Sequence, residues 1–254
     1  MRIRQRCLCL LSFILMASPV AQAQTHELRL ALADSTCDAM KRVGEAFQAS
    51  HPVTISYNCK SSGLLAKGMR GGAVSADIFV SADQEWMDQV VEGDLVERDQ
   101  VTTPWSNALV VAVPKSSKLQ IRTMQDLAGP AVSTILIGDP STAPFGRRGK
   151  EALESAGLWD QIKTKVQTRK NISLLGESLA AAGNTTVGLL FRTNLNDQLR
   201  EAMVISKTMH KPIRYYLAPL KSAAGKADVT AFLKFLQSRP AREIIAAARF
   251  DVEK

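Results

Sequence analysis

Two short runs of hydroxyl residues stand between a predicted strand and a predicted helix. Ser35–Thr36 follows the alternating segment Leu28–Ala33, and Ser61–Gly63 follows Val53–Cys59, which is rich in β-branched and aromatic residues. Helix N-termini carry N–H groups without intrahelical partners and a partial positive charge, and serine adds a short neutral donor. The pattern favours a small-anion site built without cations. The alternative, that these serines are ordinary helix caps, stays open.

Residues that build catalytic centres are sparse and scattered. The three histidines, His26, His51 and His210, fall in predicted loops. The chain has no Gly-x-Ser-x-Gly elbow, Cys-x-x-Cys pair, His-x-x-x-His pair or phosphate loop ending in Gly-Lys-Ser/Thr. The sequence therefore predicts a non-enzymatic protein without a cofactor. An exported enzyme or regulator that reuses the fold is the alternative from another class, and turnover assays would identify it.

The first 23 residues have the pattern of an export signal. Arg2, Arg4 and Arg6 form a basic start, an apolar stretch follows, and Ala21-Gln22-Ala23 has the small-x-small pattern of a cleavage site. The apolar stretch is shorter than the roughly 20 residues that span a bilayer. We expect a signal peptide at residues 1–23 and a mature, soluble protein in the periplasm.

The net charge argues against nucleic-acid binding. It is +8 for the 254 residues, and +5 once the predicted signal peptide is removed. The excess is mild and is not concentrated, and aromatic residues do not interleave with basic runs. The densest basic stretch, Lys163–Lys170, is typical of a solvated face. We expect no nucleic-acid partner.

Two cysteines remain after the predicted cleavage, Cys37 and Cys59, because Cys7 and Cys9 lie in the signal peptide. Export leads to an oxidising compartment, and the predicted elements place Cys37 in the first turn of one helix and Cys59 at the end of the neighbouring strand. A disulfide between them is one interpretation. Two small buried thiols are the other.

Strands and helices alternate along the chain, which predicts an α/β fold with mostly parallel sheets flanked by helices. No flexible linker separates the two sets of elements, so we expect two lobes joined by strands near 105–107 and 211–213. The first lobe would comprise residues 24–106 and 213–254, and the second lobe residues 107–212. The predicted strands are 28–33, 53–59, 77–80, 108–113, 134–137, 186–191 and 215–218, and the predicted helices are 39–47, 64–69, 86–91, 124–127, 146–156, 173–182 and 229–236.

Four motifs, in order, resemble those of periplasmic molybdate-binding proteins of ABC transporters. They are ADIFVSADQEWMD at Ala76–Asp88, NALVVAVPK at Asn107–Lys115, IGDP at Ile137–Pro140 with APFG behind it, and YYLAPL at Tyr215–Leu220. The resemblance covers nearly all of the mature chain. It implies a two-lobed periplasmic binding protein fold with a ligand cleft between the lobes. It also implies a monomeric receptor that captures molybdate or tungstate and delivers it to a membrane permease.

The resemblance implies four donors for the oxyanion, all neutral. Ser35 and Ser62 match the hydroxyl donors of the first lobe, and the backbone N–H groups of Phe145 and Ile172 match the donors of the second lobe. Helix ends and hydroxyls satisfy the lone pairs of a dianion in fixed geometry, and the size of the cavity then selects the ion.

Two positions depart from the family pattern. Phe191 stands where some members have a tyrosine hydroxyl, and Asp34 stands where members usually have a small or hydroxyl residue. A carboxylate about 4 Å from a unit negative charge would cost about 4 kcal/mol at an effective dielectric constant near 20. Either Asp34 turns away and accepts backbone N–H groups at a helix start, or it accepts a proton from hydrogen phosphate or hydrogen arsenate. The alternative ligands are therefore a protonated oxyanion or a small organic anion.

Overall fold

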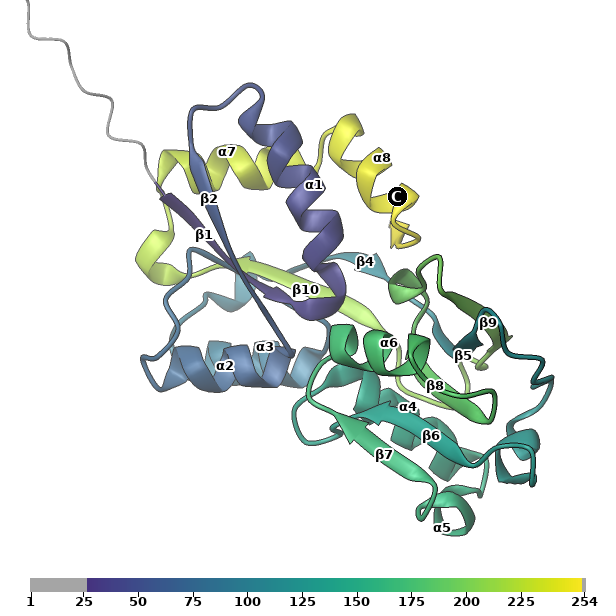
Figure 1. The fold of residues 1–254 in the computed structure, drawn as a ribbon. Coiled ribbons are helices and arrows are strands. Elements are labelled where there is room, and N and C mark those ends of the chain that lie inside the picture. Colours follow the sequence, from purple (N-terminus) through teal and green to yellow (C-terminus); the bar gives the residue numbers. More distant parts are fainter. Residues whose placement is uncertain (1–26, 253–254) are drawn as a thin grey trace, which may run out of the picture.

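Two β-sheets, each with helices on both faces, organise the chain (Figure 1). The computed structural model describes residues 27–252, so the predicted signal peptide at residues 1–23 lies outside the described residues. Within these residues, no helix combines the length and the apolar character needed to cross a membrane.

The six-stranded sheet has the strand order β11-β4-β10-β3-β1-β2. Its strands are β1 (Glu27–Ala33), β2 (Thr54–Lys60), β3 (Ile78–Ser81), β4 (Thr102–Ser106), β10 (Arg214–Pro219) and β11 (Asp251–Val252). The five-stranded sheet has the order β7-β6-β8-β5-β9. Its strands are β5 (Leu109–Pro114), β6 (Thr134–Gly138), β7 (Val166–Arg169), β8 (Thr186–Phe191) and β9 (Leu199–Val204).

The helices of the described chain cover the sheets. They are α1 (Cys37–Gln48), α2 (Ser62–Arg70), α3 (Gln84–Glu92), α4 (Pro144–Ser155), α5 (Trp159–Ile162), α6 (Ile172–Ala180), α7 (Ala227–Leu236) and α8 (Arg239–Ala247). Short 3₁₀ turns lie at Asp34–Thr36 (η1), Arg98–Gln100, Met124–Ala128, Arg192–Asn194 and Lys221–Ala223. The helix predicted at 124–127 is thus a 3₁₀ turn, and the helix predicted at 229–236 is not the last, because α8 and β11 follow it.

Side chains of β1 alternate between the two faces of its sheet, and each face packs against its own layer of helices. Leu28, Leu30 and Leu32 belong to the core that also contains the buried faces of α1, α7 and α8. Ala31 points to the other face and packs in the core of α2 and α3. Side chains of a strand alternate between faces, so one leucine-rich strand anchors both layers. Figure 1 shows α1 and α7 on one side of this sheet and α2 and α3 on the other.

The sheets are mixed rather than mostly parallel. β1 runs parallel to β2 and β3, and β6 runs parallel to β7 and β8. β10 is antiparallel to β3 and β4, and β5 is antiparallel to β8 and β9. These antiparallel strands flank the two places where the chain crosses between the sheets, at 107–108 and 205–213. A chain that passes directly from one sheet to the other does not return over a helix, which parallel pairing would require.

Candidate functional site

A small cavity lies where four helical N-termini meet between the two halves of the molecule. η1 and α2 reach it from the six-stranded half, and α4 and α6 reach it from the five-stranded half. The cavity brings together the six residues that sequence analysis singled out for the oxyanion site. They are Asp34, Ser35, Ser62, Phe145, Ile172 and Phe191.

The size of this cavity restricts what it can hold. About 10 Å³ is open to the centre of a group the size of a water molecule. Pockets for drug-sized organic ligands occupy roughly 300–1,000 Å³, whereas a single water needs about 10–15 Å³. In this closed arrangement of the two halves, the enclosed space is about that of one water molecule, and it is too small for a sugar or a peptide.

The hydroxyl of Ser35 is held by a buried chain of hydrogen bonds. Ser35 Oγ lies 3.0 Å from the Oη of Tyr215, and Asn107 Nδ2 donates to that same Oη at 2.8 Å. Because an amide nitrogen can only donate, this arrangement favours Tyr215 donating its own hydrogen to Ser35. The hydrogen of Ser35 is then available to a ligand. Burial raises the pKa of Tyr215 to about 12, so its hydroxyl stays protonated.

The hydroxyl of Ser62 is held by a backbone N–H group. Ser62 is fully buried at the first position of α2, and its Oγ accepts the N–H of Ala82 at 3.0 Å. The Ser62 hydrogen therefore remains free to donate. The next residue, Gly63, donates its N–H to the carbonyl of Thr142 at 3.1 Å, which links the two halves. A Cβ at Gly63 would lie 2.8 Å from that carbonyl oxygen, so this close approach requires glycine.

α4 and α6 supply main-chain donors from the five-stranded half. Phe145 is the second residue of α4, and Ile172 is the first residue of α6, where N–H groups have no intrahelical acceptor. In α6 the N–H of Leu174 goes to the side chain of its cap, Asn171, at 2.8 Å, and the N–H of Ser173 goes to Asp34 at 3.0 Å. The N–H of Ile172 is thus the one left for a ligand at this helix start.

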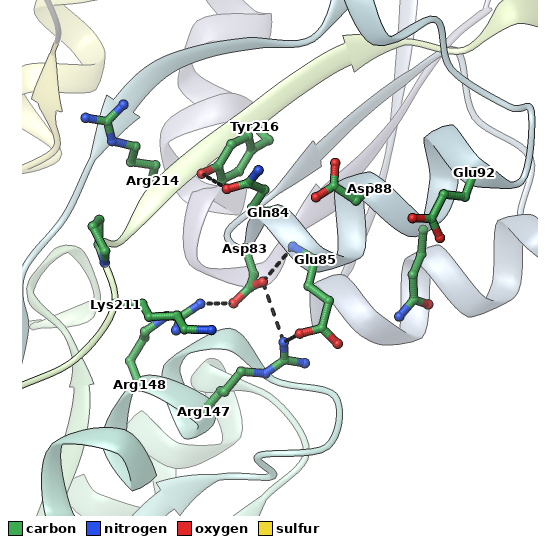
Figure 2. A pocket seen from close by; sticks show the side chains of 12 residues that line it. Asp83, Gln84, Glu85, Asp88, Glu92, Arg147, Arg148, Lys211, Arg214 and Tyr216 are labelled. Atoms are coloured by element: carbon green, nitrogen blue, oxygen red, sulfur yellow. Dashed lines mark hydrogen bonds and ion pairs between the residues drawn. The ribbon is translucent and has the colours of Figure 1, made fainter. Parts of the chain in front are cut away.

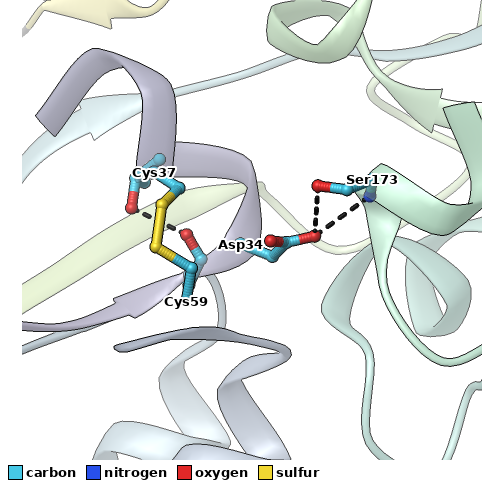
Figure 3. The surroundings of a disulfide bond; sticks show 6 residues. Asp34, Cys37, Cys59 and Ser173 are labelled. Carbon is cyan, nitrogen blue, oxygen red and sulfur yellow. Dashed lines mark hydrogen bonds between the residues drawn. A yellow bond between two sulfur atoms is a disulfide. The ribbon is translucent and has the colours of Figure 1, made fainter. Parts of the chain in front are cut away.

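Asp34 links the two halves at the edge of the cavity (Figure 3). Its Oδ2 accepts the backbone N–H of Ser173 at 3.0 Å and the Oγ of Ser173 at 2.8 Å. The carboxylate therefore binds a backbone N–H at a helix start, but the helix is α6 of the opposite half rather than its own. Asp34 also lines the cavity.

Phe191 forms an apolar wall of the cavity. Its ring meets those of Phe145 and Tyr215 edge to face, with centroids 6.2 and 6.4 Å away. No hydroxyl is offered from this position. None of the described residues that line the cavity is Lys, Arg or His, so the helical N-termini are the positive ends that face it.

Paired cationic side chains lie in a separate, open cleft of about 660 Å³ (Figure 2). Asp83 caps α3 by accepting the N–H of Glu85 at 2.9 Å, and it forms ion pairs with Arg148 and, at 3.6 Å, with Arg147 of α4. Arg147 also pairs with Glu85. Asp83 and Arg148 are 3% and 5% exposed, so this contact between the halves is nearly dry.

A disulfide joins Cys37 at the start of α1 to Cys59 near the end of β2, with Cα atoms 6.0 Å apart (Figure 3). It ties together the two segments that carry Ser35 and Ser62. The disulfide therefore holds the segments of Ser35 and Ser62 to each other within the six-stranded half.

Several residues with a role in this geometry were not predicted as site residues. Tyr215 and Asn107 lie in motifs that sequence analysis quoted, but their hydrogen bonds to the site depend on the crossing strands. Ser173, Asp83 and Arg148 join elements distant in sequence, and no local pattern identifies them. Ser61 lies in the quoted hydroxyl run and also lines the cavity.

Comparison with known proteins gives the family. Residues 28–251 match the family described as bacterial extracellular solute-binding protein. The match spans most of the chain, so the chain belongs to this family. The family is non-enzymatic, in agreement with the prediction from the sequence.

Individual relatives are similar along nearly their whole length. The molybdate-binding protein ModA of Haemophilus influenzae is 27% identical over 91% of this chain and 92% of its own. The solved periplasmic molybdate-binding protein of Azotobacter vinelandii superposes with a TM-score of 0.79 at 19% identity, over 89% of this chain and 100% of its own. The sulfate-binding protein SubI of Mycobacterium tuberculosis superposes with a TM-score of 0.76 at 16% identity, over 89% of this chain and 87% of its own. The predicted two-lobed periplasmic binding protein fold is confirmed.

Proposed function

Because the chain belongs to the bacterial extracellular solute-binding proteins, we propose that it captures a small tetrahedral oxyanion, molybdate or tungstate, and delivers it to the permease of an ABC transporter. The observation that carries this proposal is the set of neutral donors that converge from four helical N-termini on the small cavity between the halves, with no cation among its described lining residues. The molybdate-binding relatives support the same ligand class.

The proposed donors are the hydroxyls of Ser35 and Ser62 and the N–H groups of Phe145 and Ile172. Hydrogen bonds to a charged acceptor are stronger than those between neutral groups, so a few such donors suffice for a dianion. The oxygens of Ser35 and Ser62 already face donors, the Tyr215 hydroxyl and the Ala82 N–H. Both hydroxyls are therefore placed to donate, which favours a fully ionised ion over one that must donate a proton. We expect the size of the ligand-bound site to select molybdate and tungstate over the smaller sulfate.

The proposed receptor works by closure. Its lobes are residues 24–106 with 213–254, and residues 107–212, joined by the two crossings. Donors from both lobes reach one ion only when the lobes are together, so ligand binding stabilises the closed form. Export by the signal peptide at 1–23 and action as a monomer in the periplasm complete the proposal.

A second candidate ligand rests on Asp34. Its carboxylate lines the cavity and is an acceptor, so a hydrogen phosphate or hydrogen arsenate ion could donate a proton to it. The two hydrogen bonds that Oδ2 accepts from Ser173 favour the first proposal, because they give this oxygen donors without a ligand.

Calorimetric titration of the ligand-stripped, refolded mature protein tests the proposal. We expect saturable one-to-one binding of molybdate and tungstate, weaker binding of sulfate, and no binding of phosphate at neutral pH. Binding of phosphate together with no binding of molybdate or tungstate would overturn the proposed ligand and favour the second candidate. Circular dichroism before each titration shows that the refolded protein is native.

A further inference from the structure

The hydroxyl of Ser61 is buried without a hydrogen-bond partner. Ser61 is 4% exposed, and its Oγ is one of the buried side-chain atoms in the described part of the chain that lack any partner. Ser61 also lines the cavity between the halves. Most buried side-chain polar atoms have at least one hydrogen-bond partner, so an unpaired hydroxyl at a cavity calls for an explanation.

Ser61 occupies a position where serine usually caps a helix, yet it does not cap α2. It directly precedes Ser62, its backbone is extended (φ −60°, ψ 143°), and no hydrogen bond runs from its side chain to the helix. A capping oxygen normally accepts the N–H of the second or third helical residue. Here the N–H of Gly63 goes to the carbonyl of Thr142 at 3.1 Å, and the N–H of Leu64 goes to the carbonyl of Ser61 itself at 3.0 Å.

The usual capping partners of Ser61 are therefore taken by backbone contacts. The bond from Gly63 crosses to the other half of the molecule, so the closed arrangement itself withdraws that donor from Ser61. What remains is a short, neutral and unpaired hydroxyl on a residue that lines the cavity, one position before Ser62. A hydroxyl can donate to an anion without any change in its surroundings.

We propose that Ser61 is a further oxyanion donor, so that α2 offers two adjacent hydroxyls to the ligand. This inference rests on the proposed function and extends its donor set beyond Ser35 and Ser62. It also accounts for the loss of a hydroxyl at Phe191, because Ser61 returns one neutral donor to a cavity in which that position offers none. A bound oxyanion would give this hydroxyl an acceptor.

The test is Ser61→Ala, measured by calorimetric titration with molybdate and by thermal unfolding without ligand. Alanine removes only the hydroxyl. We expect molybdate affinity to fall by about ten- to a hundredfold, the range for a lost hydrogen bond to a charged group. The melting temperature of the ligand-free protein should stay the same or rise, because alanine removes an unpaired buried hydroxyl.

Ser238→Ala is the matched control. Ser238 also stands directly before a helix, but its hydroxyl accepts the N–H of Ala241 and thus caps α8. This variant should lower the melting temperature and leave molybdate affinity unchanged.

Two results separate the inference from the proposed function. If the unaltered protein binds molybdate and Ser61→Ala binds it equally well, Ser61 is not a donor, although the proposed function stands. If the unaltered, folded protein binds neither molybdate nor tungstate, the proposed function fails, and the assignment of Ser61 to this ligand fails with it. A fall in melting temperature of Ser61→Ala with unchanged affinity would show a structural role instead.

Discussion

Tyr215→Phe tests whether the Tyr215 hydroxyl, which lies outside the cavity, orients the Ser35 hydroxyl for ligand binding. The ring of Tyr215 is fully buried, and its Oη bonds both Ser35, at 3.0 Å, and Asn107, at 2.8 Å. Phenylalanine keeps the ring and removes both bonds. Asn107 keeps its hydrogen bond to Thr193 at 2.9 Å, so the substitution does not strip that amide of all partners.

The expected sizes follow from what each group touches. Ser35→Ala removes a hydrogen bond to a charged ligand, worth about 1.5–3 kcal/mol, or about ten- to a hundredfold in affinity. Tyr215→Phe removes a neutral bond that only orients Ser35, worth about 0.5–1.5 kcal/mol, or roughly two- to tenfold. Because Tyr215 acts through Ser35, the double variant should bind no more weakly than Ser35→Ala alone.

The assay is calorimetric titration with molybdate of four proteins: the unaltered chain, each single variant and the double variant. Burial raises the pKa of Tyr215 to about 12, so its hydroxyl is protonated at both pH 6 and pH 9 and the loss should be equal at these two values. Tyr216→Phe is the control, since its Oη donates to Gln84 at 3.3 Å in an exposed contact of the separate charged cleft.

Additive losses in the double variant would refute this reasoning, because they would show that Tyr215 affects binding without Ser35. Affinity of Tyr215→Phe equal to that of the unaltered protein would refute it as well. A loss in Tyr216→Phe of the same size would mean that the assay reports a general disturbance of β10.

Three further predictions concern charge and covalent structure. Asp34→Asn keeps an acceptor at the contact between the halves and removes a negative charge beside the ligand, so molybdate affinity in titrations should be unchanged or higher; phosphate binding that is lost in this variant would contradict the proposed ligand. Burial raises the pKa of Asp77, but hydrogen bonds led by those from Arg29 outweigh it and hold the pKa at about 2. The stability from this lowered pKa, about 2 kcal/mol, is therefore present above pH 4 and lost as the pH falls toward 2. Asp77→Asn should abolish this pH dependence, as measured by urea unfolding at each pH. Reduction of the Cys37–Cys59 bridge should remove about 3 kcal/mol of stability and lower the melting temperature, whereas two thiols titrated in the denatured, unreduced protein would rule the bridge out.

Local signals in the sequence were sufficient to predict the central elements and the approach of the helix ends. The alternation at Leu28–Ala33 and the three- and four-residue spacing of Met40, Val43 and Phe47 are properties of single elements, and the structure buries those faces. Hydroxyls that follow strands come together because neighbouring parallel strands end at the same edge of a sheet. The cavity at Ser35 and Ser62 follows from that rule.

Two strands of the five-stranded sheet, β7 and β9, could not be predicted in the same way. Their positions are mostly exposed or partly buried and do not alternate strictly. Their sequences therefore lack the period that identified β1. α8 is different, because Ser238 and Pro240 at its start form a recognisable helix start signal that could have predicted it.

Contacts between the halves cannot be predicted from any local sequence pattern. Asp34 and Ser173 are 139 residues apart, and Asp83 and Arg148 are 65 apart. From the sequence alone, the Asp34 carboxylate near an anion site is expected to be unfavourable, because its hydrogen-bond partner cannot be identified. The structure supplies the partner, and the same side chain becomes a link between the halves.

The polar character of these links suits a receptor whose closure depends on its ligand. The bond from Ser173 to Asp34 is exposed, where such bonds contribute little, and the nearly dry pair of Asp83 and Arg148 gains from attraction about what it loses by desolvation. We propose that contacts of small net value leave the open and closed forms close in free energy, so that the few kcal/mol from an oxyanion bound by donors of both halves decide between them.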